Sequence, residues 1–271
     1  MGCMAHHVLR FAAGTDVGRR RKTNEDSAFA GPRLLAVADG MGGHPHGDVA
    51  SRTAIETMAA LPLAGDPAED LAAGVAEVSA LLDDLGRDDP EMARTGTTLT
   101  AMAWDGAGFT VAHIGDSRAY VLRAGELYQL TRDHTMVQSL VEGGQLTEEE
   151  AARHPKGSAL VKALQSGSSG EPDVFRYDAR PGDRYLLCSD GLSGLVAREE
   201  IRETTARAPS PADAVTRLID LANEAGGQDN ITCVVADVIA PSIAPRLEPL
   251  MIGAADDTGP LARLGRRFRR P

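Results

Sequence analysis

The sequence Leu34-Leu35-Ala36-Val37-Ala38-Asp39-Gly40-Met41-Gly42-Gly43-His44 joins an apolar run to a carboxylate and a glycine-rich turn. An uninterrupted apolar run of this kind predicts a strand buried on both faces. Asp39 stands where that strand leaves the core, and the glycines after it allow a sharp turn and a close approach to a ligand. A carboxylate in this position suits a hard metal ion, although a single Asp-Gly pair is also an ordinary turn.

The same arrangement recurs three times along the chain. The apolar runs 109–114 and 185–188 lead to Asp116 and Asp190, and Asp229 precedes the run 231–236. If the last strand runs antiparallel to the others, its start lies at the sheet edge where they end. We therefore expect Asp39, Asp116, Asp190 and Asp229 at one edge, and their repetition favours a metal centre with several ions over four unrelated turns.

The composition limits the classes of protein to which the chain can belong. The chain has 271 residues, a net charge of −11 and 42% hydrophobic residues, which is ordinary for a soluble protein of one large or two small domains. The negative charge argues against nucleic-acid binding. No apolar run has the length of a membrane span, and the N-terminus lacks the apolar stretch of a signal peptide.

Cysteine usage points to a reducing compartment. Cys3, Cys188 and Cys233 are odd in number and widely spaced, which argues against a disulfide framework and a zinc knuckle. We therefore expect a cytoplasmic protein.

The remaining patterns predict mixed secondary structure. Apolar spacing predicts helices over 47–61, 67–84, 198–208 and 211–225, whereas β-branched runs between 95 and 130 predict a meander of antiparallel strands. Residues 131–165 are expected to form a surface flap with two short helices, a common place for substrate contacts.

Two charged segments allow two interpretations each. The basic run 19–22 precedes Glu25 and Asp26, so it is either a solvated loop or an arginine that binds a phosphoryl group beside acids that hold metal-bound water. Residues 241–271 contain five prolines and a basic end, and we expect a disordered tail after a domain of residues 1–240. The tail is either a solvated end or a contact for an acidic partner or anionic lipid.

Several motifs, in this order, resemble the metal-dependent serine/threonine phosphatases of the protein phosphatase 2C type, over residues 8–238. They are Asp16-x-Gly18-x-x-Arg21, Asn24-Glu25-Asp26, Ala38-Asp39-Gly40-Met41-Gly42-Gly43, Gly96-Thr97-Thr98, His113-Ile114-Gly115-Asp116-Ser117-Arg118, Cys188-Ser189-Asp190-Gly191-Leu192 and Gln228-Asp229-Asn230-Ile231-Thr232. Met41 and the segment Asp133-His134-Thr135 are similar to bacterial members in particular.

The resemblance implies an α+β fold in which two packed antiparallel sheets are flanked by helices. It also implies two Mn²⁺ or Mg²⁺ ions and a third ion that is held more weakly. Asp39 is then the bridging ligand, the Gly40 carbonyl binds one ion, and Asp190 and Asp229 complete the other. The resemblance further implies that Glu25 and Asp26 act through water, that Asp116 helps to hold the third ion with Ser158 as an additional candidate, and that Arg21 binds substrate phosphate.

The residue types agree with this chemistry. Hard divalent ions prefer carboxylate and carbonyl oxygens, and two such ions can activate a shared water as a hydroxide for in-line attack on phosphorus. Neither Cys188 nor Ser189 is then needed as a nucleophile. Eukaryotic relatives carry a proton-donating His where this chain has Met41, so a water or a loop histidine, His44 or His46, must be considered as the acid.

Other functions remain open at this stage. The expected activity is hydrolysis of phosphoserine and phosphothreonine in proteins, which would oppose bacterial Ser/Thr kinases. The expected partners are these kinases and their substrates, and the protein is expected to be a monomer. The alternatives are a regulatory phosphatase with a single target and a pseudophosphatase that binds phosphoproteins without turnover, although no motif carboxylate is missing. A metal-dependent nuclease is disfavoured because no basic groove signature is present.

Overall fold

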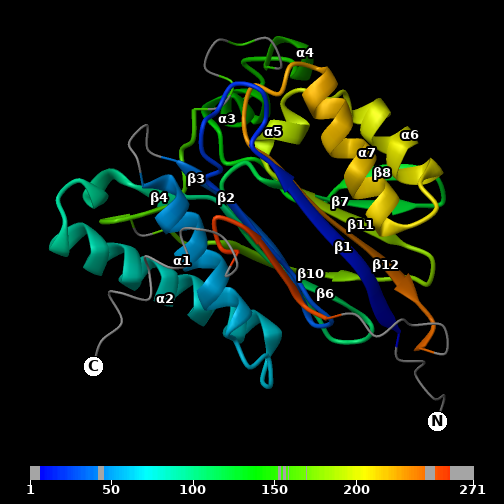
Figure 1. The fold of residues 1–271 in the computed structure, drawn as a ribbon, viewed down its shortest axis with the longest axis horizontal. Coiled ribbons are helices and arrows are strands. Elements are labelled where there is room, and N and C mark those ends of the chain that lie inside the picture. The colour runs from blue at the N-terminus through cyan, green and yellow to red at the C-terminus, as the bar shows by residue number, and fades with distance from the viewer. Residues whose placement is uncertain are drawn as a thin grey trace.

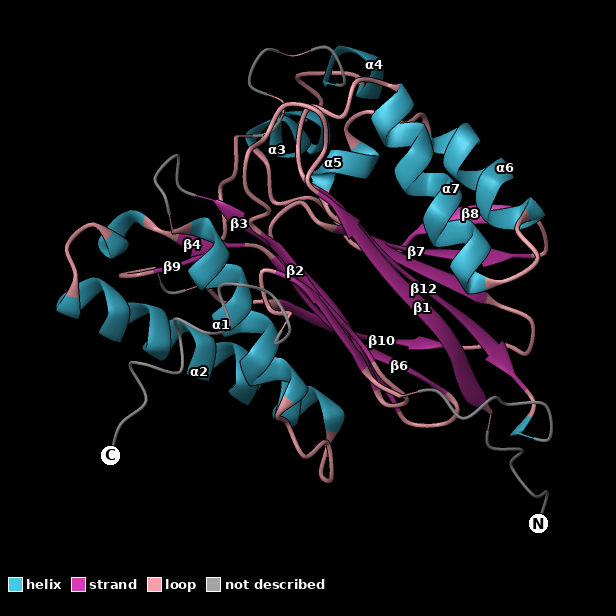
Figure 2. Cartoon of the chain, in the orientation of Figure 1, coloured by secondary structure: helices cyan, strands magenta, loops and turns pink. Residues whose placement is uncertain are grey.

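Two antiparallel sheets packed face to face, with helices on both outer faces, make up the protein (Figures 1 and 2). The computed structural model describes residues 7–41, 46–151, 154, 157, 159–168, 170–241 and 248–256. The predicted α+β class and four-layer order of helix, sheet, sheet and helix are thereby confirmed.

Each sheet brings together strands that are distant in the sequence. The first sheet runs β1 (Val8–Asp16), β12 (Ile231–Ile239), β11 (Arg184–Cys188), β7 (Arg118–Arg123) and β8 (Glu126–Gln129). The second runs β10 (Asp173–Asp178), β6 (Gly108–Ile114), β5 (Leu99–Trp104), β3 (Leu34–Met41), β2 (Asp26–Ala30) and β13 (Leu250–Gly253), and it also includes β4 (Gly96–Thr97), which pairs with β3, and β9 (Leu164–Gln165), which pairs with β4.

The helices cover opposite faces of the sandwich. The second sheet is covered by α1 (Gly47–Ala59) and α2 (Pro67–Asp88), and the first by α5 (Asp190–Ser193), α6 (Arg198–Arg207) and α7 (Pro211–Glu224). The short helices α3 (Met136–Glu142) and α4 (Glu148–Ala151) lie near α5 at one end of the sandwich (Figure 1), and a 3₁₀ turn spans Met92–Arg94.

Side chains that point alternately to the two faces of the buried strands form the layers of the core. In β3, Leu34, Ala36 and Ala38 pack against α1 and α2, whereas Leu35 and Val37 face the other sheet. This is the two-sided burial that the continuous apolar run predicts, because successive side chains of a strand point to opposite faces. A third apolar layer, which includes Leu186 and Val235, lies between the first sheet and α7.

The prediction of a disordered tail over residues 241–271 is wrong for residues 248–256. The strand β13 adds to the edge of the second sheet, with Met251 opposite Phe29 and Ile252 opposite Ala28. Ala255, two residues further on, is 2% exposed. A run of only three apolar residues beside Pro249 gives no strand signal on its own, and the exposed edge of β2 supplies the pairing that orders it. The basic end of the chain lies outside the described residues.

No helix in the described part of the chain combines the length and apolar character needed to span a bilayer.

An ion-pair network links three adjacent strands of the first sheet, β1, β12 and β11. Asp237 on β12 lies opposite Arg10 on β1 and Arg184 on β11, and it binds them at 2.5 Å on either side. Arg184 also donates to the backbone oxygens of Thr205 and Ala208, which anchors the end of α6. The Asp237 side chain is 10% exposed and that of Arg184 is 11% exposed, so removal of Asp237 leaves the nearly buried charge of Arg184 without its carboxylate partner.

We therefore expect Asp237→Ala to lower the free energy of unfolding by about 3 kcal/mol. Urea denaturation followed by circular dichroism measures this change. Glu199→Ala, which removes an exposed i,i+3 ion pair with Arg202, is the control and should leave the free energy of unfolding close to that of the wild type. Equal losses in the two variants would contradict the role given to the buried network.

Candidate metal centre

Strand register brings the predicted carboxylates together at one edge of the sandwich. Asp26 on β2 lies directly opposite Asp39 on β3. In the other sheet, β11 ends at Cys188, opposite Cys233 near the start of β12, so Asp190 follows the end of β11 and Asp229 precedes the start of β12 at the same edge. The antiparallel arrangement that the sequence required is therefore present.

Asp26 joins the two sheets. Its side chain is fully buried, and one oxygen, Oδ2, accepts hydrogen bonds from Ser189 Oγ at 2.8 Å and Thr232 Oγ1 at 2.7 Å. Ser189 and Thr232 belong to the other sheet edge, beside Asp190 and at the start of β12. The second oxygen, Oδ1, is buried without a hydrogen-bond partner.

Hydroxyl groups fix the positions of Asp39 and Asp116. Thr98 exchanges two bonds with Asp39: its Oγ1 accepts from the Asp39 N–H at 3.0 Å and its N–H donates to the Asp39 carbonyl at 2.9 Å. Thr98 Oγ1 also bonds Ser117 Oγ at 2.7 Å, next to Asp116. The Gly-Thr-Thr motif thus ties Asp39 on β3 to the turn between β6 and β7 that carries Asp116.

Close backbone contact brings Asp190 and Asp229 near each other. Gly191, at the start of α5, approaches the Asn230 carbonyl so closely that a Cβ there would lie 1.9 Å from its oxygen, so only glycine fits. Asp190 also lies close enough to Asp39 and Asp229 for its charge to act on theirs. The site therefore joins carboxylates from both sheets.

Asn230 holds the basic loop over the site. Its Oδ1 accepts from the Glu25 N–H at 2.8 Å, and its Nδ2 donates to the carbonyls of Val17 and Thr23 at 3.1 and 2.9 Å. Through this clamp the Arg21 guanidinium reaches Asp229 Oδ2 at 2.7 Å while its side chain stays 49% exposed. Arg21 therefore lies at the rim of the acidic cluster.

The cluster is electrostatically strained. Burial raises the pKa of Asp26 to about 7 and that of Asp116 to about 7, and in Asp116 the nearby Asp190 adds to the shift. Burial, followed by the charges of Asp26 and Asp190, holds the pKa of Asp39 well above its usual range. Burial and Asp229 likewise raise the pKa of Asp190. Like charges crowded in a poorly solvated site disfavour one another's ionisation.

This donor set fits hard divalent cations. The donors are carboxylate oxygens, which such cations prefer, and one buried oxygen of Asp26 lacks a hydrogen-bond partner. Among the described residues, Arg21 is the only basic side chain that forms an ion pair with the cluster. In the described residues, no group of three His, Cys, Asp or Glu side chains is already arranged as a metal site, and Asp229 is paired with Arg21. Bound ions would replace this contact and relieve the repulsion.

Other predicted residues have definite places. The Gly40 N–H donates to the Glu25 carbonyl at 3.1 Å, which fixes the backbone beside Asp39. Glu25 packs against Gly47 at the start of α1, and burial raises the pKa of its carboxyl group. Ser158 and His44 lie outside the described residues, so their predicted contributions stay predictions.

Five supporting residues had no role assigned from sequence. They are Thr98, Ser117, Ser189, Asn230 and Thr232. Ser117, Ser189 and Asn230 stand directly beside the predicted ligands Asp116, Asp190 and Asp229, and a hydroxyl or amide side chain adjacent to such a carboxylate is the signal that could have identified them. Thr98 and Thr232 have no predicted ligand as a neighbour in the sequence.

The family follows from comparison with known proteins. The Protein phosphatase 2C family model matches residues 13–235. The chain therefore belongs to the protein phosphatase 2C family.

Particular relatives agree with this assignment. The serine/threonine protein phosphatase PstP of Mycobacterium tuberculosis is 46% identical over 250 residues, which cover 91% of this chain and 48% of PstP. The protein phosphatase PhpP of Streptococcus pneumoniae is 34% identical over 235 residues, which cover 83% of this chain and 95% of PhpP. The chain thus spans about half the length of the mycobacterial relative.

Solved structures agree as well. The M. tuberculosis PstP phosphatase superposes with a TM-score of 0.83 at 48% identity, covering 86% of this chain and 99% of that one. A structure of the PstP catalytic domain in complex with two manganese ions gives a TM-score of 0.80 at 46% identity, covering the same shares of the two chains.

The raised carboxyl pKa values predict an unusual pH dependence of stability without metal. Asp titrates near 3.9 when unfolded but near 7 at Asp26 and Asp116 in the folded protein, so the folded state binds more protons between these values. Stability from this source is complete below pH 4 and is lost as pH rises through 7. In EDTA, the midpoint of thermal unfolding should therefore fall between pH 5 and 7.5, and less steeply in Asp116→Asn.

The matched control is Asp178→Asn. Asp178 is 88% exposed and is the last residue of β10, so this variant should keep the wild-type dependence of the unfolding midpoint on pH. A wild-type midpoint that does not fall over this pH range, or that falls no more steeply than that of Asp116→Asn, would contradict the assigned shifts.

Proposed function

We propose that this chain hydrolyses phosphoserine and phosphothreonine in proteins and depends on two Mn²⁺ or Mg²⁺ ions. The observation that carries the proposal is the convergence of carboxylates from both sheets at one edge, with the Arg21 guanidinium at its rim. Membership of the family and the names of the relatives support the same activity.

Each candidate ligand has an assigned place. Asp39 would bridge the two ions, the Gly40 carbonyl would bind one, and Asp190 and Asp229 would complete the other. Asp116 would hold a third, weaker ion. Glu25 and Asp26 would act through water, and the unpartnered Asp26 Oδ1 is free to accept such a water.

The ions, when bound, supply a water of lowered pKa and neutralise phosphoryl charge. The protein's own part is to orient these groups and bind the substrate. The Asn230 clamp and the Thr98 bonds hold Arg21 and Asp39 in place, so little reorganisation is needed on binding. Once Asp229 is engaged elsewhere, Arg21 can make charge-assisted hydrogen bonds to a phosphate. Met41 has no proton to donate, so the leaving oxygen would take its proton from water or from a loop histidine, His44 or His46.

The proposed setting follows from the same features. The natural substrates would be phosphorylated proteins, including Ser/Thr kinases and the proteins that they modify, and the chain would act as a monomer in the cytoplasm. Cys188 and Cys233 are both buried free thiols, as a reducing compartment favours. A pseudophosphatase finds no support, because the motif carboxylates that define the site are all present.

Hydrolysis of a phosphothreonine peptide tests the proposal. Phosphate release should occur with manganese and stop with excess EDTA. Asp39→Asn should lower turnover at least a hundredfold, since loss even of outer partners costs about 10–100-fold in such sites. Asp178→Asn is the control and should keep wild-type turnover. Release that persists in EDTA, or near wild-type activity of Asp39→Asn, would overturn the two-ion assignment.

Arg21→Ala should raise the KM for a phosphopeptide about tenfold while changing kcat less, because a charge-assisted hydrogen bond to phosphate is worth about 1.5–3 kcal/mol. Arg20→Ala, its exposed neighbour, is the matched control and should leave both constants near wild type. A change confined to the pH profile would show that Arg21 has a different role.

A further inference from the structure

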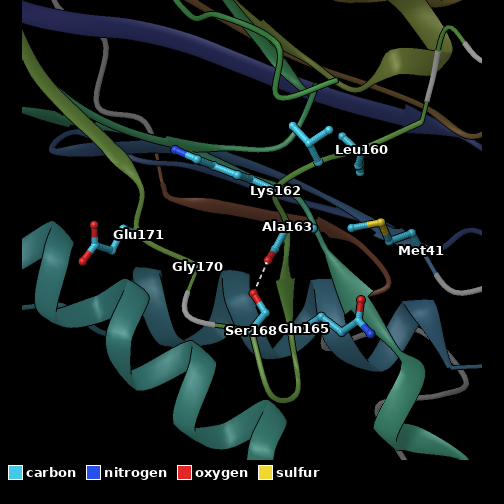
Figure 3. Close-up of a pocket in the computed structure, with 9 residues that line it drawn as sticks. Met41, Leu160, Lys162, Ala163, Gln165, Ser168, Gly170 and Glu171 are labelled. Carbon is cyan, nitrogen blue, oxygen red and sulfur yellow. Dashed lines mark hydrogen bonds between the residues drawn. The ribbon is translucent and has the colours of Figure 1, made fainter. Parts of the chain in front are cut away.

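A groove adjoins the carboxylate cluster on the side of β9. It has a volume of about 630 Å³ and is lined by Met41, residues 160–163, Gln165, Ser168, Gly170 and Glu171. In Figure 3, Met41 and Leu160 lie together at one end and Glu171 at the other. Because Met41 follows Asp39 and Gly40 directly, the groove begins where the proposed catalytic centre ends.

Backbone bonds fix the groove wall. The Val161 N–H donates to the His134 carbonyl at 2.8 Å, and the Met136 N–H donates to the Ala159 carbonyl at 2.8 Å. Thr135 and Leu160 form a β-bridge between these contacts. Further along, Ser168 Oγ donates to the Ala163 carbonyl at 2.9 Å, as the dashed line in Figure 3 shows. The wall therefore exists before any ligand arrives.

His134 anchors this wall to the core. It is 5% exposed, its Nδ1 accepts from the Gly115 N–H at 3.1 Å, and its Nε2 lies 3.1 Å from Asp173 Oδ2. Lys162 reaches the other oxygen of Asp173 at 3.5 Å. The Asp133-His134-Thr135 segment thus connects the turn before Asp116 to the groove.

Val161 stands out on this fixed wall. Its backbone is bonded, yet its side chain is 57% exposed, more than any other large apolar side chain in the described residues. An apolar side chain held over a groove gains free energy when another apolar group covers it, at roughly 25 cal/mol per Å². Lys162 and Glu171 carry opposite charges, so the groove does not select a strongly charged ligand.

We propose that this groove binds the polypeptide that flanks the phosphorylated residue of a substrate, with an apolar side chain packed against Met41, Leu160 and Val161. The inference rests on the proposed phosphatase function. Its support is the continuity of the groove with the carboxylate cluster, its preformed wall, and a size that fits a few side chains. The substrates would therefore be phosphoproteins with an apolar residue close to the phosphorylated serine or threonine.

Paired substrates test the proposal by kinetics. Phosphothreonine peptides carrying Leu or Ser at each flanking position are compared with p-nitrophenyl phosphate, which has no flank. The ratio of kcat/KM for the best leucine peptide to that for p-nitrophenyl phosphate should fall about tenfold in Val161→Glu. Val174→Glu alters another exposed valine, 38% exposed on β10 and outside this groove, and should leave the ratio unchanged.

Methyl NMR gives a readout that does not need turnover. In valine-labelled protein, the Val161 methyl signals should shift with the leucine peptide and not with the serine peptide, while the Val174 signals stay fixed. An unchanged kinetic ratio in Val161→Glu, or unmoved Val161 signals, would overturn the groove assignment. Equal Val161 shifts with both peptides, or dilution-dependent shifts without peptide that indicate a second copy of the chain, would also overturn it.

Failure of the proposed function looks different. If wild-type protein released phosphate from neither peptide nor p-nitrophenyl phosphate, the phosphatase proposal would fail, and the Val161 signals would still decide whether the groove binds peptide.

Discussion

The bond between the Asp26 carboxylate and the hydroxyls of Ser189 and Thr232 is the constraint on which the functional end of the molecule depends. It crosses from β2 in one sheet to the ends of β11 and β12 in the other. A fully buried carboxylate is costly unless its oxygens are hydrogen-bonded. Here the bonds also align the two sheet edges, so carboxylates that are far apart in the sequence meet. The Ala254 N–H donates to the Asp26 carbonyl, which ties β13 to the same point.

The buried carboxylates at the acidic edge destabilise the fold, whereas the apolar layers stabilise it. Three apolar layers, packed between the sheets and beneath both helical faces, stabilise the chain. At the edge, Asp26, Asp39, Asp116 and Asp190 all have raised pKa values, because burial and mutual repulsion penalise their charged forms. Proteins tolerate such strain mainly at functional sites, where a bound ligand relieves it.

Most of the architecture could be predicted because it follows from local patterns. The apolar runs of β3, β11 and β12 end or begin at Asp39, Asp190 and Asp229, so a two-sided burial rule and antiparallel pairing were enough to place the carboxylates together. The period of apolar residues also predicted α1 and α7 to within a few residues.

What could not be predicted depends on long-range partners. β13 is ordered by the edge of β2, and β9 has only two residues, so neither has a sequence pattern of its own. The roles of Thr98, Ser189 and Asn230 likewise depend on which groups the fold places opposite them. A hydroxyl or amide in a motif reveals its donor and acceptor capacity but not its partner.

The central claim is that carboxylates from both sheets form one centre for two divalent ions. Calorimetric titration of the EDTA-treated and dialysed protein with manganese tests it most directly. We predict two ions bound per chain in the wild type, with heat of binding for both lost in Asp39→Asn, since both sites share that ligand. A stoichiometry below two in the wild type, or two ions retained in Asp39→Asn, would contradict it.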